Sequence, residues 1–280
     1  MRIFITGHKG QLGSALRQAF AGHDLALADL PELDITNPIQ IVQAIADFRP
    51  DLVLHPAAYT DTAGCQRNPD LAYRVNALGT RNVALGCQRS GAALLYISTN
   101  EVFDGRKTEP YLEWEPANPL NVYGRSKQAG EWYVQSLLQR YYIVRIAWLY
   151  GGPNSFVTKT LQWAQAGREL RMVTDEVATP TYVCDLAPAI VALVGQPVYG
   201  VYHFTNAGQC SRYEWAQRIL ALAGRTDVNL VPARLADFPD AVPKPAYSVL
   251  RNFCGADLGI TLRPWEEALE ESFRHDSARC

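Results

Sequence analysis

The first half of the chain alternates short apolar runs with amphipathic stretches, and this alternation limits the folds open to it. Apolar runs of this length predict buried strands, and they are "RIFIT" (2–6), "DLALAD" (24–29), "DLVLHPAA" (51–58), "AALLYIST" (92–99) and "YYIVRIAWLYG" (141–151). Helical spacing of apolar residues predicts helices over 11–20, 38–48 and 71–90, and another that carries Tyr123. Repeated strand–helix units form parallel sheets covered on both faces. We therefore predict an α/β fold, a doubly wound parallel sheet of the Rossmann type.

Beyond Gly151 the alternation becomes irregular. Helices are predicted over 155–167, 182–194, 212–224 and 263–273, and strands over 169–174 and 200–206. We interpret residues 1–150 as a dinucleotide-binding domain and residues 151–280 as a smaller region that mainly binds substrate. Segments near 180–206 are expected to return to the sheet domain, so that the two regions interleave.

Charge and hydropathy exclude several classes of protein. The formal net charge is -2 and only 19% of residues are charged, which argues against a nucleic-acid-binding face. No apolar stretch approaches about 18 residues, so we expect no membrane span and a cytoplasmic protein. The cysteines form no CxxC pair, which favours reduced thiols over disulfides or a metal site. They are Cys65, Cys87, Cys184, Cys210, Cys254 and Cys280.

A glycine-rich loop, "TGHKGQLG", lies between the first predicted strand and the first predicted helix. Gly7, Gly10 and Gly13 are three residues apart, whereas the usual dinucleotide fingerprint has its first two glycines two apart. Glycines here let the backbone turn tightly and approach a pyrophosphate, which a helix N-terminus favours. A tight turn with no ligand is the alternative interpretation.

Two residues of opposite charge bear on the choice between NADH and NADPH. Asp29 follows the second predicted strand, where a carboxylate hydrogen-bonds ribose hydroxyls and repels a 2′-phosphate. Lys9 in the glycine loop has the opposite effect if it contacts that phosphate, although it is equally a solvated loop residue. The choice stays open, with a preference for NADH.

The stretch "NVYGRSKQAGE" sets Tyr123 four residues before Lys127, so that on a helix both side chains share one face. Such pairs are common and usually inert. Here the pair follows a glycine loop and a strand ending in Thr99, which favours a catalytic role. Gly124 costs about 1 kcal/mol against alanine in a helix, so we expect a cofactor or a neighbouring helix to pack closely there.

Together these features resemble the extended short-chain dehydrogenase/reductases, and within them the dTDP-4-dehydrorhamnose reductase family. The resemblance covers nearly the whole chain, through "GQLG", "AAYTD", "STNEVFDG", "PLNVYGRSKQAGE", "RIAWLYG", "ATPTYVCDLA" and "KPAYSVL". It implies reduction of the C4 ketone of dTDP-4-dehydro-L-rhamnose by NADH or NADPH. Asn100 and Glu101 depart from the family, which usually has aspartate and tyrosine there.

The resemblance implies a role for each candidate residue. Thr99, Tyr123 and Lys127 are expected to be catalytic, with Lys127 lowering the pKa of Tyr123 and holding the nicotinamide ribose. The expected cofactor-binding residues are Gly7, Lys9, Gly10, Gln11, Leu12, Gly13, Asp29, Asp34, Ile35, Ala57, Ala58, Tyr59, Asn76, Tyr123 and Lys127. The expected substrate-binding residues are Thr60, Thr99, Asn100, Glu101, Tyr123, Trp148 and Lys244, the last of them pairing with a diphosphate.

Other functions stay open at this point. A reductase or epimerase acting on another nucleotide-activated sugar fits the same residues. A non-catalytic subunit, similar to the regulatory subunit of methionine adenosyltransferase, has the same fold but no need of Thr99, Tyr123 and Lys127 together. The partners expected are a nucleotide-sugar substrate and a second copy of the chain in a homodimer. No carboxylate cluster in the sequence suggests a metal.

Overall fold

In the computed structural model, which describes residues 1–274, a six-stranded parallel sheet forms the centre of the molecule. Its strands are β1 (Arg2–Thr6), β2 (Asp24–Ala28), β3 (Leu52–His55), β4 (Ala93–Thr99), β5 (Tyr141–Ile146) and β10 (Gly200–His203). They lie in the order β10-β5-β4-β3-β1-β2, and every neighbouring pair is parallel. The predicted doubly wound sheet is confirmed.

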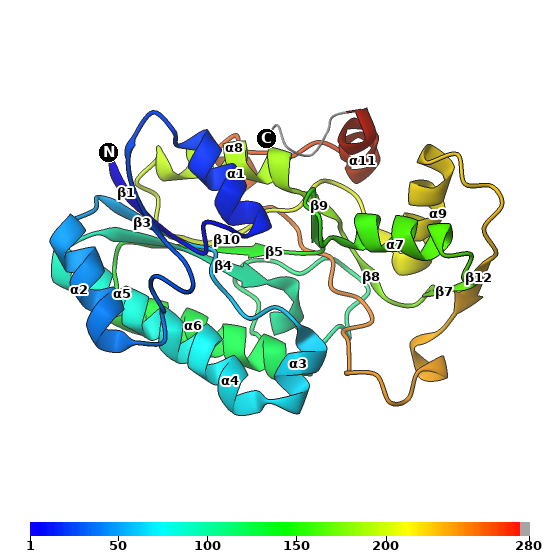
Figure 1. Cartoon of the computed structure of the whole chain (residues 1–280), viewed down its shortest axis with the longest axis horizontal. Helices are drawn as coiled ribbons and strands as arrows, with labels where there is room; N and C mark the ends of the chain where they lie inside the picture. The colour runs from blue at the N-terminus through cyan, green and yellow to red at the C-terminus, as the bar shows by residue number, and fades with distance from the viewer. Residues whose placement is uncertain (275–280) are drawn as a thin grey trace.

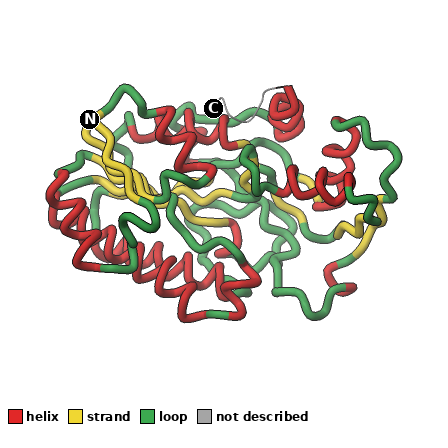
Figure 2. Tube along the Cα trace, in the orientation of Figure 1, coloured by secondary structure: helices red, strands yellow, loops and turns green. Residues whose placement is uncertain are grey.

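Helices cover both faces of this sheet (Figures 1 and 2). On one face α1 (Gln11–Ala19) packs beside α8 (Val183–Val194), and both bury apolar side chains against β1, β3 and β4. On the other face α2 (Pro38–Phe48), α5 (Thr80–Ser90) and α6 (Val122–Leu137) bury a second apolar cluster. Both faces being covered explains why β3 and β4 are buried along their whole length.

The helix predicted over 71–90 is interrupted. The structure has α3 (Thr62–Arg67) and α4 (Pro69–Tyr73), then a π-helical segment (Arg74–Gly79) that leads into α5. Single π-helical turns within α-helices occur frequently at functional sites. Asn76 lies in this segment and is almost fully buried.

The remaining elements form a smaller lobe at one end of the sheet (Figure 1). Its helices are α7 (Phe156–Gln165), α9 (Arg212–Leu222) and α11 (Trp265–Arg274), whereas α10 (Cys254–Asp257) packs against β10 of the main sheet. Its short strands are β6 (Leu149–Tyr150), β7 (Leu170–Val173), β8 (Val177–Ala178), β9 (Thr181–Tyr182), β11 (Cys210–Ser211) and β12 (Leu230–Ala233), paired two by two. Between these elements the chain returns to the main sheet as α8 and β10.

Three predicted strands are too long, and the one over 200–206 ends at His203. The one over 141–151 is wrong because Trp148 adopts a left-handed backbone, φ 44°, which separates β5 from β6 and directs β6 to pair with β9. The one over 51–58 ends at His55, because Pro56 has no N–H to donate to a neighbouring strand.

The cysteines only partly match the prediction of reduced thiols. Cys65, Cys87, Cys210 and Cys254 are free, but Cys184 is disulfide-bonded. No helix within residues 1–274 is both long and apolar enough to cross a membrane. Over the same residues, no three His, Cys, Asp or Glu side chains are grouped so that they could hold a metal ion.

Two buried histidines predict a pH-dependent stability. Burial lowers the pKa of His55 and of His203 to about 3. The positive charge of Lys127 lowers the pKa of His55 further, and that of Arg145 lowers the pKa of His203 further. In the unfolded chain each histidine has its ordinary pKa of 6.5 and is protonated below that pH, whereas in the folded protein it stays neutral down to about pH 3. The free energy of unfolding should therefore fall as the pH drops from 6.5 toward 3. Each histidine contributes at most about 1.4 kcal/mol per pH unit.

Urea unfolding across this range tests the prediction with His55→Gln and the exposed His23→Gln. His55→Gln should make the pH dependence of unfolding shallower by about one histidine's contribution, while His23→Gln should leave it unchanged. Equal slopes for wild type and His55→Gln would contradict a neutral, buried imidazole.

Candidate active site

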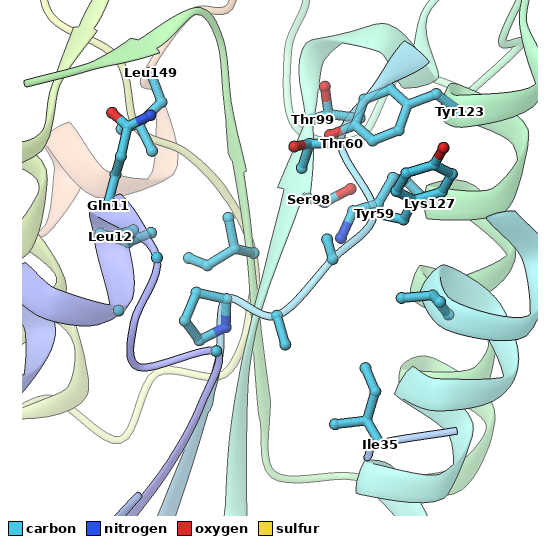
Figure 3. Close-up of a pocket in the computed structure, with 18 of the residues that line it drawn as sticks. Gln11, Leu12, Ile35, Tyr59, Thr60, Ser98, Thr99, Tyr123, Lys127 and Leu149 are labelled. Carbon is cyan, nitrogen blue, oxygen red and sulfur yellow. The ribbon is translucent and has the colours of Figure 1, made fainter. Parts of the chain in front are cut away.

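A cavity of about 780 Å³ opens at the carboxyl ends of the sheet strands, where ligands bind in doubly wound folds. Its walls come from the turns after β1, β2, β3, β4 and β5, from the first two turns of α6 and from α7. Figure 3 shows Gln11, Leu12 and Leu149 on one side and Thr60, Thr99, Tyr123 and Lys127 on the other. The cavity therefore brings the glycine loop and the Tyr–Lys pair to one place.

The glycine loop needs its glycines for packing. Gly7 has φ 60°, and a Cβ there would lie 2.8 Å from the Ala57 Cα. A Cβ on Gly13 would lie 2.0 Å from the carbonyl oxygen of Gly7, because the start of α1 packs directly against the backbone of the turn after β1. Gly10 caps α1 without a side chain, and helix geometry leaves the next N–H groups without intrahelical acceptors. The residues at this helix start, Gln11, Leu12 and Gly13, line the cavity, and free N–H groups at a helix N-terminus suit a pyrophosphate.

This packing predicts different effects for two alanine substitutions. Gly13→Ala must displace backbone, so we expect cofactor affinity to fall by at least tenfold, in line with the usual cost of overpacking. Gly10→Ala places its Cβ 3.3 Å from the same oxygen, which a small shift relieves. Fluorescence titration with NADH measures both. Equal affinities for the two variants would contradict the predicted close packing at Gly13.

The end of the cavity next to β2 is acidic. Asp29, Asp34 and Ile35, which were predicted to bind the cofactor, line it there. The Asp29 carboxylate accepts the backbone N–H groups of Lys9, at 2.9 Å, and of Leu30, at 2.8 Å. Lys9 itself does not line the cavity, because its ammonium pairs with Glu32 at 2.9 Å. Of the two opposing signals, the carboxylate is thus the one placed in the cavity.

Asn76 supports the cavity wall without lining it. Its side chain accepts the N–H of Tyr59 at 2.8 Å and donates to the Tyr59 carbonyl at 3.0 Å. It also donates to the Ser126 hydroxyl at 3.0 Å. The segment Pro56–Tyr59, which includes the predicted Ala57 and Ala58, is thereby tied to α6. Asn76 itself is not among the residues that line the cavity.

The Tyr–Lys pair lies on the first two turns of α6, and its electrostatics differ from the prediction. Burial is the main cause that raises the pKa of the Tyr123 phenol, and the Glu101 carboxylate adds to it. The nearby Thr99 hydroxyl lowers the pKa and so opposes both effects. The predicted lowering by Lys127 is wrong for the protein alone. The phenol is therefore protonated at neutral pH, the state that a proton donor needs.

Lys127 is a buried cation with few neighbours of opposite charge. It is 2% exposed, and its ammonium lies 4.1 Å from the centre of the Tyr96 ring. Burial lowers the pKa of Lys127 to about 7, although the Glu131 carboxylate one turn away acts in the other direction. An ammonium with a pKa in this range responds readily to a negative charge that forms nearby.

Gly124 packs against a neighbouring helix, one of the two predicted possibilities, which is the single 3₁₀ turn Asn100–Val102. A Cβ there would lie 2.1 Å from the carbonyl oxygen of Glu101, in the turn that follows β4. Asn121 caps α6 by accepting the Gly124 N–H at 2.8 Å. The close neighbour is thus the turn after Thr99, which sets Thr99 and Tyr123 at a fixed separation.

Glu101 and Lys244 form an ion pair that joins the two lobes. The Lys244 ammonium lies 2.6 Å from Glu101 Oε1 and 3.2 Å from the Thr62 hydroxyl. Asn121 donates to Glu101 Oε2 at 2.7 Å and to the Pro243 carbonyl at 2.9 Å. Lys244 does not line the cavity and its charge is already paired. The structure therefore does not support its predicted role as the anchor of a diphosphate.

Asn100, the other departure from the family pattern, has a similar role. Its side chain is buried and donates to the Ser248 hydroxyl at 2.7 Å. Both departures thus tie the turn after β4 to residues 243–248, while Asn100 and Glu101 still line the cavity beside Thr60.

Trp148 forms a rigid wall of the cavity. Its ring is parallel to that of Trp215, with 5.4 Å between the centroids, and the Arg212 guanidinium lies 3.7 Å from its centre. Arg212 in turn pairs with Glu176 at 3.3 Å. This packing accounts for the left-handed backbone of Trp148, since strained residues persist where their surroundings hold them.

A buried ion pair joins α6 to the central sheet. Glu131 and Arg145 are about 5% exposed and make two contacts, of 2.9 and 2.7 Å. The Ser98 hydroxyl, next to Thr99, donates to the same carboxylate. The pair joins α6 to β4 and β5 directly beneath Lys127.

Several lining residues were not predicted. Ile97, Ser98 and Ile146 follow from the rule that strand carboxyl ends form the site, which would have found them. Asn154 and Lys159 line the cavity from the smaller lobe, and no sequence motif marks them.

Comparisons with known proteins agree on one family. The family model described as the RmlD substrate binding domain matches residues 1–277. A Bacillus subtilis protein, spore coat polysaccharide biosynthesis protein SpsK, is 35% identical over all of this chain and 99% of its own. A Mycobacterium tuberculosis dTDP-4-dehydrorhamnose reductase is 37% identical over 96% of this chain and 91% of its own. The solved dTDP-4-dehydrorhamnose reductase of Bacillus anthracis, in complex with NADP, is 40% identical, covers 98% of both chains and has a TM-score of 0.93.

Proposed function

This chain belongs to the RmlD substrate binding domain family, and we propose that it catalyses the NAD(P)H-dependent reduction of the C4 ketone of dTDP-4-dehydro-L-rhamnose to dTDP-L-rhamnose. The observation that carries this proposal is the placement of Thr99, Tyr123 and Lys127 beside the glycine loop in one cavity. A binding subunit has no use for a buried lysine of lowered pKa beneath a protonated phenol.

The cavity fits a nicotinamide dinucleotide. The glycine loop leaves no room for a Cβ at Gly13, and the N–H groups at the start of α1 suit the pyrophosphate. Gln11 presents a buried carbonyl oxygen that has no partner within residues 1–274. Asp29 lines the cavity, which supports its proposed contact with the adenosine ribose, and the Lys9 ammonium is paired with Glu32. These contacts favour NADH over NADPH, and we propose that preference.

The residues of the chain then position the ketone and donate a proton to its oxygen. When bound, the reduced nicotinamide provides the hydride that C4 receives. The hydroxyls of Thr99 and Tyr123 lie together and hydrogen-bond the ketone oxygen. As C4 gains the hydride, Tyr123 donates its proton to that oxygen, and an alcohol results. The Lys127 ammonium stabilises the phenolate left on Tyr123. Trp148 and Thr60 bound the space for the sugar nucleotide.

We propose a cytoplasmic location for the protein. We also propose residues 1–150 as the cofactor-binding part and the smaller lobe as the main source of substrate contacts.

Substrate-dependent oxidation of NADH and of NADPH, followed by absorbance, tests the function. We expect one mole of reduced cofactor to be consumed for each mole of dTDP-L-rhamnose formed, and faster with NADH. An epimerase would form product without net consumption of cofactor. No product from protein that binds the cofactor would contradict the proposal.

A further inference from the structure

The cavity contains few positive charges. Within residues 1–274, the only lysine or arginine side chains that line it are Lys127 and Lys159. Lys127 is buried beneath Tyr123 and is needed for the proton transfer. The two other lysines expected at the site, Lys9 and Lys244, lie outside the lining and are paired with Glu32 and Glu101.

Lys159 differs from these lysines in two ways. It is exposed, on α7, and its side chain has no ion pair or hydrogen bond in the part of the chain that the structure describes. It lines the cavity together with Asn154 and Trp148, on the side of the smaller lobe. Its ammonium can therefore bind a ligand without breaking an interaction that the structure shows.

A nucleotide sugar contains a negatively charged diphosphate, which a binding site has to neutralise with positive groups. The start of α1 is committed to the pyrophosphate of the dinucleotide, and neither Lys9 nor Lys244 is free. We propose that Lys159 binds the diphosphate of the nucleotide-sugar substrate, in place of the paired Lys244. This inference rests on the proposed function, because it assigns a substrate contact within the same cavity.

The dinucleotide is the other source of a diphosphate near α7. A Cβ on Gly152 would lie 2.4 Å from Gln11 Cγ, so the turn before α7 touches the start of α1. The side chain of Lys159 nevertheless begins seven residues further on, in the lobe that holds Trp148. A test must therefore measure the two ligands separately.

Calorimetric titration of the full-length protein with thymidine diphosphate, thymidine and NADH separates them. Lys159→Met should weaken thymidine diphosphate binding by about 10- to 100-fold, the loss typical of a hydrogen bond to a charged group. Thymidine and NADH should bind as to wild type. Lys159→Arg should retain most of the affinity. Arg168→Met, which removes an exposed charge near the end of α7 but outside the lining, should change nothing.

Three results would overturn the inference. Unchanged thymidine diphosphate affinity in Lys159→Met, with wild type binding it normally, refutes the inference alone. Weaker NADH binding with unchanged thymidine diphosphate binding assigns Lys159 to the cofactor instead. A wild type that binds neither thymidine diphosphate nor the sugar nucleotide refutes the proposed function, and the inference with it.

Discussion

Tyr123→Phe is expected to lower kcat for ketone reduction by about 10²- to 10⁴-fold, the usual range for loss of a general acid. The phenol is held protonated by burial and by Glu101, and it lies with Thr99 at the cavity. Phenylalanine keeps the ring and its packing but has no proton to give. Cofactor affinity should therefore stay within a few-fold of wild type. Steady-state kinetics and NADH titration measure the two quantities.

Tyr133→Phe is the matched control for this prediction. It removes a phenol from the same helix, at a position outside the cavity lining, and should leave kcat unchanged. If Tyr123→Phe retained near wild-type kcat, the proton would have another donor and the mechanism proposed for this site would be wrong.

Glu131→Gln is expected to lower the free energy of unfolding by about 3 to 5 kcal/mol. The substitution leaves the Arg145 guanidinium buried, about 6% exposed, without its carboxylate partner. The remaining contacts of Arg145, to the Glu113 carbonyl at 3.2 Å and to His203 at 3.4 Å, carry no negative charge. Urea unfolding of wild type and variant at one pH measures the difference.

Asp24→Asn provides the control, because it breaks an ion pair with Arg2 in which both side chains are about half exposed or more. Exposed pairs contribute at most about 1 kcal/mol. A loss of similar size in both variants would show that burial does not determine the effect at Glu131.

The strands and the glycine loop were predictable because their signals are local. A buried strand is a short apolar run, and a dinucleotide loop is a set of glycines between a strand and a helix. Tyr123 and Lys127 share a helix face by spacing alone. The break at Trp148 was not predictable, because its left-handed backbone depends on Trp215 and Arg212, which lie far along the chain.

Charge pairing was the least predictable part of the site. Lys244 and Glu101 are 143 residues apart, and no local pattern indicates that they meet. Lys9 pairs with Glu32, 23 residues away, and no local pattern indicates that contact either. Conversely, Lys159 has no motif around it and gains its position only when α7 packs beside the cavity. Electrostatic roles depend on the fold, whereas the predicted backbone elements mostly do not.

The most direct test of the function is to follow deuterium from C4-labelled NADH or NADPH during a single turnover with dTDP-4-dehydro-L-rhamnose. We expect the label at C4 of the rhamnosyl group, in an amount equal to the cofactor oxidised. Product that forms without deuterium, or oxidation of the cofactor without labelled product, would contradict hydride transfer to the C4 ketone in this cavity.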